Sequence, residues 1–124
     1  MDLPLNAAAR AANDDGEFKI AARFWNADVR LASGEQEWLL RLRDGRIAHV
    51  VRDAGASGAD AGIAAPSEVW REMLAPVPRP FFQDLYGASL HHGLQLENPE
   101  ALWPYYPALR RLLELLRDAA RGNA

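Results

Sequence analysis

Residues 38–51, WLLRLRDGRIAHVV, decide the fold class of this chain. Trp38, Leu40 and Leu42 alternate with other side chains ahead of Asp44-Gly45, and a second apolar run follows that pair. Alternation places every second side chain on one face of a strand, and Asp-Gly supplies the two positive-φ residues of a tight hairpin turn. The stretch therefore predicts two antiparallel strands joined at Asp44-Gly45.

A third strand precedes this hairpin. Trp25, Ala27, Val29 and Leu31 alternate with polar residues, and Ser33-Gly34 supplies a turn into the hairpin. The three strands are expected to form a meander.

Helices are predicted on both sides of the meander. An apolar stripe with helical spacing ends at Trp25, and the alanine-rich residues 1–13 form a short helix or arm. Downstream we expect a short strand at 61–65, a helix from Pro66 to about Leu74, one or two helical turns at 81–86 ended by Gly87, a last strand over 90–97, a helix start at 98–100 and a terminal helix over 106–117. This order predicts an α+β fold with a mainly antiparallel five-stranded sheet and helices covering one face.

Composition narrows the function. The 124 residues suit a single domain over 1–124 with a core at about 15–120, and the net charge of -3 with no basic stripe argues against nucleic acid as a partner. The chain has no cysteine and no apolar run long enough for a transmembrane segment, so we expect a cytoplasmic protein. Phosphate-loop and metal-ligand spacings are missing, and we expect no cofactor and no metal.

The order of elements resembles a known family. The stretches that carry the resemblance are 26–31 (NADVRL), 37–46 (EWLLRLRDGR), 61–70 (AGIAAPSEVW) and 85–97. They are similar to the sterol carrier protein type two family in its short bacterial single-domain form, over roughly residues 18–116. The resemblance implies an apolar cavity between sheet and helices that holds a lipid, acyl chain, sterol or quinone-like molecule. It also implies a noncatalytic carrier or an accessory subunit of a lipid-related pathway.

Large apolar side chains are the candidate ligand-binding residues. They are Trp38, Trp70, Met73, Phe81, Phe82, Tyr86, Leu109 and Leu113. Rings and long aliphatic side chains build the walls of apolar pockets, and they equally fill ordinary cores. Both interpretations remain open from the sequence alone.

An enzyme is the alternative function. His91 or His92 with Asp84 could form an acid–base pair for a small isomerase or hydratase in an apolar pocket. Expected on a strand, the two histidines would point to opposite faces, so at most one could reach the pocket. We therefore predict that no residue is catalytic and that both histidines are dispensable for folding and ligand binding.

Two further segments allow two interpretations each. The proline-rich residues 76–82 could be a lid over a cavity mouth or a rigid connector. The terminal helix carries more leucines than one stripe needs, and Leu115 could add an exposed contact for a homodimer or a tunnel gate, or be an incidental surface residue.

Overall fold

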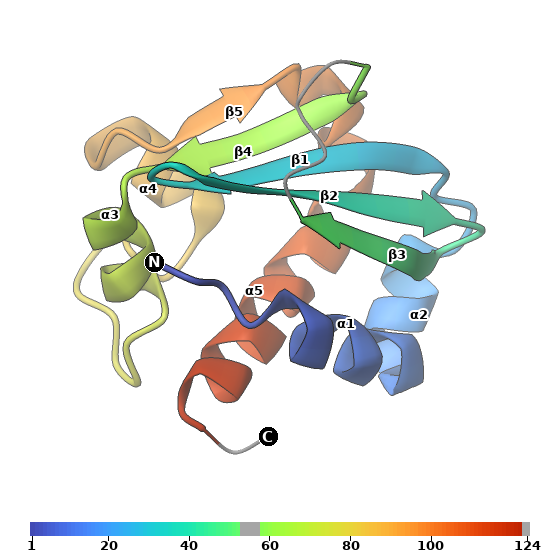
Figure 1. Ribbon diagram of the computed structural model, residues 1–124, viewed down its shortest axis with the longest axis horizontal. Coiled ribbons are helices and arrows are strands. Elements are labelled where there is room, and N and C mark those ends of the chain that lie inside the picture. Colours follow the sequence, from blue (N-terminus) through green and yellow to red (C-terminus); the bar gives the residue numbers. More distant parts are fainter. Residues whose placement is uncertain (53–57, 123–124) are drawn as a thin grey trace.

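The computed structural model describes residues 1–52 and 58–122. Five strands form one sheet in the order β3-β2-β1-β4-β5, with α1, α2 and α5 against one face (Figure 1). The strands are β1 Ala27–Ser33, β2 Gln36–Arg43, β3 Arg46–Arg52, β4 Ala61–Ala65 and β5 Gln95–Glu97. The helices are α1 Leu5–Asp14, α2 Gly16–Ala22, α3 Ser67–Met73, α4 Leu85–His91 and α5 Tyr106–Ala120, with short 3-10 turns at Pro99–Ala101 and Trp103–Tyr105. The predicted α+β class, with helices on one face of a mainly antiparallel sheet, is confirmed.

The hairpin at Asp44-Gly45 forms as predicted. Both residues have positive φ, 50° and 79°, and the turn joins β2 to β3 in antiparallel register. Gly45 is also required by close packing, because a Cβ there would lie 2.7 Å from the carbonyl oxygen of Ala22 at the end of α2. The hairpin turn therefore anchors the entry helix against the sheet.

The pairing of β1 with β4 is parallel, and local sequence patterns did not predict it. This pair places Leu31 beside Ile63 on the helix-covered face. On the opposite face Arg30 bonds both Glu37 and Glu97 and so links β1, β2 and β5. Glu97 crosses over Gly62 to reach Arg30, and a Cβ on Gly62 would collide with its carboxylate.

The region around α4 differs from the prediction. The helical turns expected at 81–86 and the strand expected from Leu90 are wrong, because α4 begins only at Leu85 and continues through Gly87 to His91. Phe81 has a left-handed φ of 68°, which breaks any helix there. A Cβ on Gly87 would lie 3.3 Å from the carbonyl oxygen of Phe81, so the glycine serves close packing rather than helix termination.

The predicted helix start at Asn98 is also displaced. Asn98 is left-handed and its side-chain amide donates to the carbonyl oxygen of Asp60, so it fastens β5 to the start of β4 instead of capping a helix. Only short 3-10 turns follow, because Pro104 and Pro107 interrupt the chain, and the long helix starts at Tyr106.

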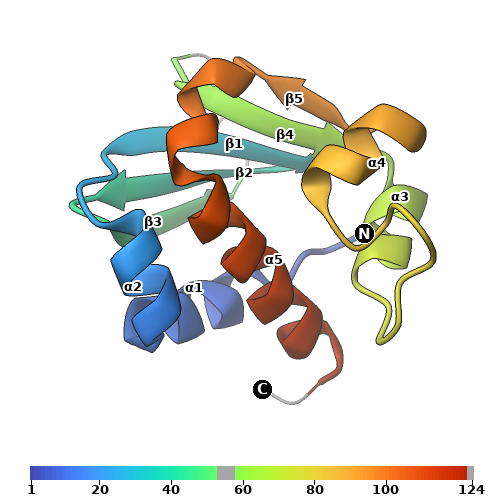
Figure 2. The same ribbon diagram turned by 180° about the vertical axis from the view of Figure 1, so that it is seen from behind.

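Helix α5 runs diagonally below the sheet, with α1 and α2 on one side of it and α3 and α4 on the other (Figure 2). The predicted short N-terminal helix is present as α1, and its apolar face is buried in the same core as the sheet. No helix in the described part of the chain is long and apolar enough to cross a membrane.

Candidate functional site

An apolar cavity of about 10 Å³ lies between the sheet and α5. Its walls come from β1, β4, α3, α4 and α5, and every lining residue is buried: Leu31, Ile63, Trp70, Leu85, Leu109, Leu112, Leu113 and Leu116. The volume is room for about one water-sized sphere, so the wall side chains nearly fill the site. Its walls are hydrocarbon and indole, so it suits an apolar molecule and offers water no hydrogen bonds.

Trp70 fixes the α3 wall of this cavity. Its indole N–H donates to the carbonyl oxygen of Ala32 on β1 at 2.8 Å, which satisfies its polar atom without turning it toward the cavity. The ring is 1% exposed. Trp70 therefore presents an apolar face to the cavity while it ties α3 to the sheet.

The connection between α3 and α4, residues 74–84, is held by α5 at both of its ends. The Arg117 guanidinium donates to the carbonyl oxygens of Met73 at 2.9 Å and Gln83 at 3.3 Å. Burial lowers the pKa of Arg117, and backbone oxygens are its partners in place of a carboxylate. Arg117 thus pins both ends of the connection with one side chain.

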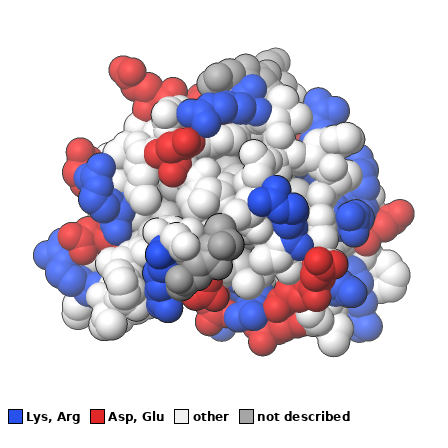
Figure 3. Space-filling model, turned by 60° about the horizontal axis from the view of Figure 1, so that its bottom comes forward, with Lys and Arg blue, Asp and Glu red and all other residues white. Residues whose placement is uncertain are grey.

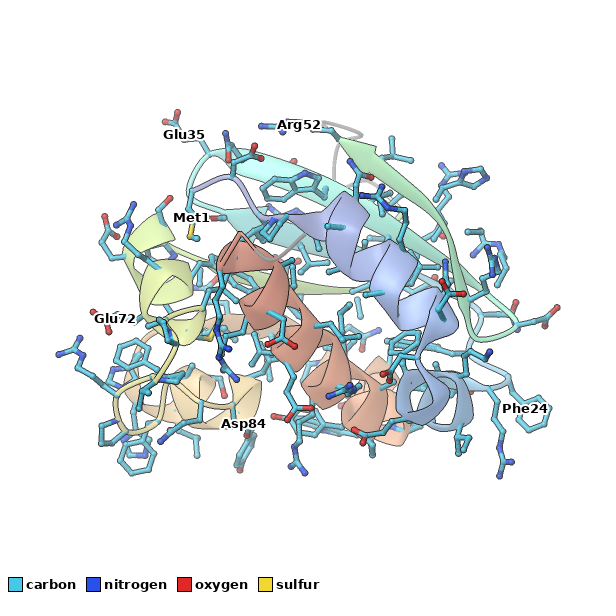
Figure 4. All side chains as sticks on the ribbon, turned by 90° about the horizontal axis from the view of Figure 1, so that it is seen from below. Met1, Phe24, Glu35, Arg52, Glu72 and Asp84 are labelled. Atoms are coloured by element: carbon cyan, nitrogen blue, oxygen red, sulfur yellow. The ribbon has the colours of Figure 1, made fainter. Side chains whose placement is uncertain are left out.

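Tyr106 makes a second fastening at the start of α4. Its hydroxyl donates to Asp84 Oδ1 at 2.7 Å and accepts from the backbone N–H of Tyr86 at 2.8 Å. Burial, followed by the bond to Asp84, raises the pKa of Tyr106. Asp84 lies where α4 approaches α5 in the view from below (Figure 4). The first turn of α4 is therefore held by a neutral phenol.

Charges do not gather around the helical layer. Lys and Arg side chains alternate with Asp and Glu around an uncharged central area on the face shown in Figure 3. Several pairs are salt-bridged, including Arg111 with Asp15 and Arg79 with Glu72. This face has no expanse of one sign that would attract a polyanion.

The structure brings three of the eight predicted ligand-binding residues into the cavity wall: Trp70, Leu109 and Leu113. Met73, which belongs to α3 like Trp70, is fully buried in the core. Phe82 is buried along a surface groove beside α3.

The other three predicted residues lie elsewhere. Trp38 is buried beside α1, under the guanidinium of Arg52, which is 5.4 Å from its ring. Phe81 and Tyr86 are 51% and 48% exposed, because the left-handed turn at Phe81 and the outer face of α4 direct them to solvent.

The remaining wall residues were absent from the predicted set: Leu31, Ile63, Leu85, Leu112 and Leu116. Leu112 and Leu116 belong to the predicted stripe of the terminal helix, and that stripe was the signal for them. Ile63 lies in β4, whose five residues are almost all buried, and such a short continuous apolar run is typical of an interior parallel strand.

The histidines occupy a helix end, so the strand geometry expected for them is wrong. His91 ends α4 and stacks on Phe81, and His92 follows it, stacks on Phe82 and has Nε2 3.2 Å from the carbonyl oxygen of Pro80. Neither histidine lines the apolar cavity. Asp84 is engaged by Tyr106 and Arg110, and among the described residues no bond joins it to either histidine.

Leu115 is buried, at 8% exposure, so the expectation of an exposed leucine there is wrong. One turn earlier, Arg111 of α5 bonds Asp15 between α1 and α2. This side of α5 therefore packs under α1 and α2, which explains why its apolar surface is wider than one stripe.

Known proteins were compared with the chain by sequence and by structure. No protein-family model matches the sequence, and no curated protein matches it. A crystal structure of sterol carrier protein 2 superimposes with a TM-score of 0.74 at 24% identity, over 92% of this chain and 93% of that one. The solution structure of a conserved hypothetical protein from Thermus thermophilus, described as possibly a sterol carrier protein, gives the same TM-score and identity over 97% of this chain and 88% of that one. The chain therefore has the fold of sterol carrier protein 2.

Proposed function

We propose that this protein binds a hydrophobic small molecule between the sheet and α5, at the end closed by α3 and α4. The observation that carries the proposal is a wall made entirely of buried apolar side chains from five elements. The likeness to sterol carrier protein 2 supports it, because the fold is shared over nearly the whole chain.

Binding requires the cavity to enlarge. Pockets that hold drug-sized ligands measure about 300–1,000 Å³, far above the closed volume of about 10 Å³. We propose that α4 with residues 74–84 is the wall that moves, because α3 and α4 approach the other elements closely at fewer positions than α1 and α2 do. A ligand replaces the apolar contacts of Leu85 with its own, which limits the cost of opening.

A carrier or accessory role belongs to the same proposal. A protein that only holds an apolar molecule passes it to another protein or to a membrane, so the exchange step has to open the same wall. The chemistry is binding and release, with no bond made or broken.

Fluorescence titration with butylpyrene, an apolar probe without a head group, tests this function. We expect saturable binding to the parent protein. Leu85→Trp fills the cavity from α4 and should weaken binding at least tenfold, about 1.4 kcal/mol. Leu90→Trp, on the same helix but 62% exposed, is the matched control and should leave binding unchanged.

Far-UV circular dichroism of both variants checks that they are folded. Saturable binding that Leu85→Trp does not weaken would place the probe elsewhere. A parent protein that does not bind butylpyrene at all would overturn the proposal.

A further inference from the structure

Buried side-chain polar atoms without a hydrogen-bond partner are few in the described residues: Arg30 Nε, Ser33 Oγ and Gln36 Oε1. Arg30 lies on the face away from the helices, and its other two nitrogens bond Glu37 and Glu97. Over residues 1–52 and 58–122, Ser33 is the one buried polar residue, with 0% exposure. A buried hydroxyl or amide oxygen without a partner destabilises the fold, so this pair needs an explanation.

Ser33 and Gln36 face each other across the β1–β2 hairpin. They are direct partners in the antiparallel register, two residues beyond the pair Leu31 and Trp38. Side chains two residues apart on a strand share a face, so both lie on the helix-covered face of the sheet. At such a pair the Cβ atoms are about 5 Å apart, close enough for one small group to reach both polar atoms.

This polar pair lies on the same face of the sheet as a wall residue of the apolar cavity, two residues farther along the strands. Leu31, the next residue of β1 on the same face, lines the cavity. Trp70, another wall residue, donates its indole N–H to Ala32, the residue directly before Ser33. Trp70 therefore lines the cavity and also contacts β1 at the residue directly before Ser33.

The two atoms select one kind of head group. Gln36 Oε1 only accepts hydrogen bonds, whereas Ser33 Oγ both donates and accepts. A single hydroxyl group satisfies both, since it donates to Gln36 and accepts from Ser33. A carboxylate has no proton for Gln36 and brings a charge into an apolar site, which is far more costly.

We propose that Ser33 and Gln36 bind the hydroxyl group of a neutral amphiphile whose apolar body fills the cavity. This inference rests on the proposed function and adds the chemical class of the ligand and the end at which its head group lies. The head group is held at the α3 side, under the β1–β2 turn, and the apolar body extends along α5.

Three probes with the same ring system test the head-group preference: butylpyrene, pyrenebutanol and pyrenebutyrate. We expect the parent protein to bind pyrenebutanol about three- to tenfold more tightly than butylpyrene, and pyrenebutyrate most weakly. Ser33→Ala should remove the preference for the alcohol and leave butylpyrene affinity unchanged. Gln36→Leu should reduce the same preference independently.

Ser89→Ala is the matched control. The Ser89 hydroxyl lies on α4 and already donates to the carbonyl oxygen of Tyr86 at 2.7 Å, so this variant should keep the preference. Equal affinities for the alcohol and butylpyrene in the parent would overturn this inference but not the proposed function. A preference for the alcohol that survives in Ser33→Ala would do the same. Failure of all three probes to bind would overturn the proposed function, and this inference with it.

The unliganded protein supplies a second, independent measurement. If Ser33 Oγ has no partner before ligand binds, Ser33→Ala should not lower the urea midpoint of unfolding. A clear decrease would show that the hydroxyl is already bonded within the fold, and the inference would be wrong.

Discussion

The two ends of the helical layer lie under the same sheet but are held in different ways. At the α1–α2 end, defined by α1, α2 and the facing part of α5, the backbones are closely packed and side chains join different elements. Asp15 caps α2 by accepting from the Phe18 N–H and bonds Arg111 of α5, and Asn13 makes two hydrogen bonds with Ile47 of β3.

At the α3–α4 end, defined by α3, α4 and residues 74–84, the backbones lie farther from their neighbours. The polar fastenings there run from side chains of α5 to the chain around α4, through Arg117 and Tyr106. Behind them the cavity wall is apolar, and the bond from the Trp70 indole N–H to the carbonyl oxygen of Ala32 ties α3 to β1. From this difference we expect the α1–α2 end to behave as a rigid scaffold and the α3–α4 end to be the wall that opens.

The largest expected effect is a loss of stability at the α1–α2 end. Phe18 is 0% exposed in α2, and Phe18→Ala should lower the free energy of unfolding by about 3–5 kcal/mol, because a buried ring leaves a void. Urea denaturation measures the loss. Butylpyrene affinity of the folded fraction should be unchanged, and a coupled loss of affinity would show that the two ends are not independent.

A matched pair of leucines sharpens the comparison. Leu5→Ala and Leu113→Ala each remove a side chain that is 2% exposed and should each cost about 2–5 kcal/mol. Only the void left at Leu113 adjoins the proposed ligand, so saturating butylpyrene should raise the melting temperature of Leu113→Ala more than that of Leu5→Ala. Equal shifts would contradict a binding site confined to the α3–α4 end.

The stability of the α1–α2 end should also depend on pH, because of Asp15. Its hydrogen bond to Arg111, together with the Phe18 N–H, lowers the pKa of Asp15 in the folded protein. The ionised Asp15 therefore contributes to the free energy of unfolding above its unfolded-state pKa of about 3.9. That contribution is lost as the pH falls through the lower pKa of the folded protein.

Asp15→Asn keeps the helix cap and removes the charge, so it should cost about 1 kcal/mol at neutral pH and nothing in strong acid. Urea midpoints measured from neutral pH down to about pH 2 should converge for the parent and the variant. Parallel curves would mean that the ion pair contributes no stability.

The smallest expected effect is faster local opening of the wall formed by α4 and residues 74–84. Arg117→Met removes the hydrogen bonds to Met73 and Gln83 and should weaken the local fastening by about 1 kcal/mol. Amide hydrogen exchange should then be roughly fivefold faster in residues 74–91 and unchanged in α1 and α2. Arg110→Met, at a side chain that is 62% exposed, is the control and should change little. Uniformly faster exchange would argue against a separate wall.

Local sequence patterns predicted most of the sheet. Part of the cavity wall depends on contacts between residues far apart in the chain, and those contacts could not be predicted. Alternation and Asp44-Gly45 define the meander because a hairpin is a contact between neighbours in the chain. The parallel β1–β4 pair joins residues about thirty positions apart, and no local pattern states which strands meet. The wall residues Leu31 and Ile63 were missed for that reason.

The error around α4 has a different cause. Paired phenylalanines followed by Gly87 are typical of a short helix with a glycine end, whereas the left-handed Phe81 and the contact of Gly87 with it depend on tertiary packing. Shifting the helix to 85–91 moved His91 and His92 off a strand and turned Tyr86 outward. The assignment of site residues in this region therefore depended on a helix boundary, the least reliable part of a sequence-based prediction.

The most direct test of the central claim is a methyl NMR experiment with bound butylpyrene. We expect intermolecular NOEs from the pyrene ring to methyl groups of Leu31, Ile63, Leu109 and Leu113, which come from three elements around the cavity. Methyl groups of Leu5 and Ile47, at the α1–α2 end, should show none. NOEs confined to the α1–α2 end, or to exposed Leu90 outside the wall, would contradict the account.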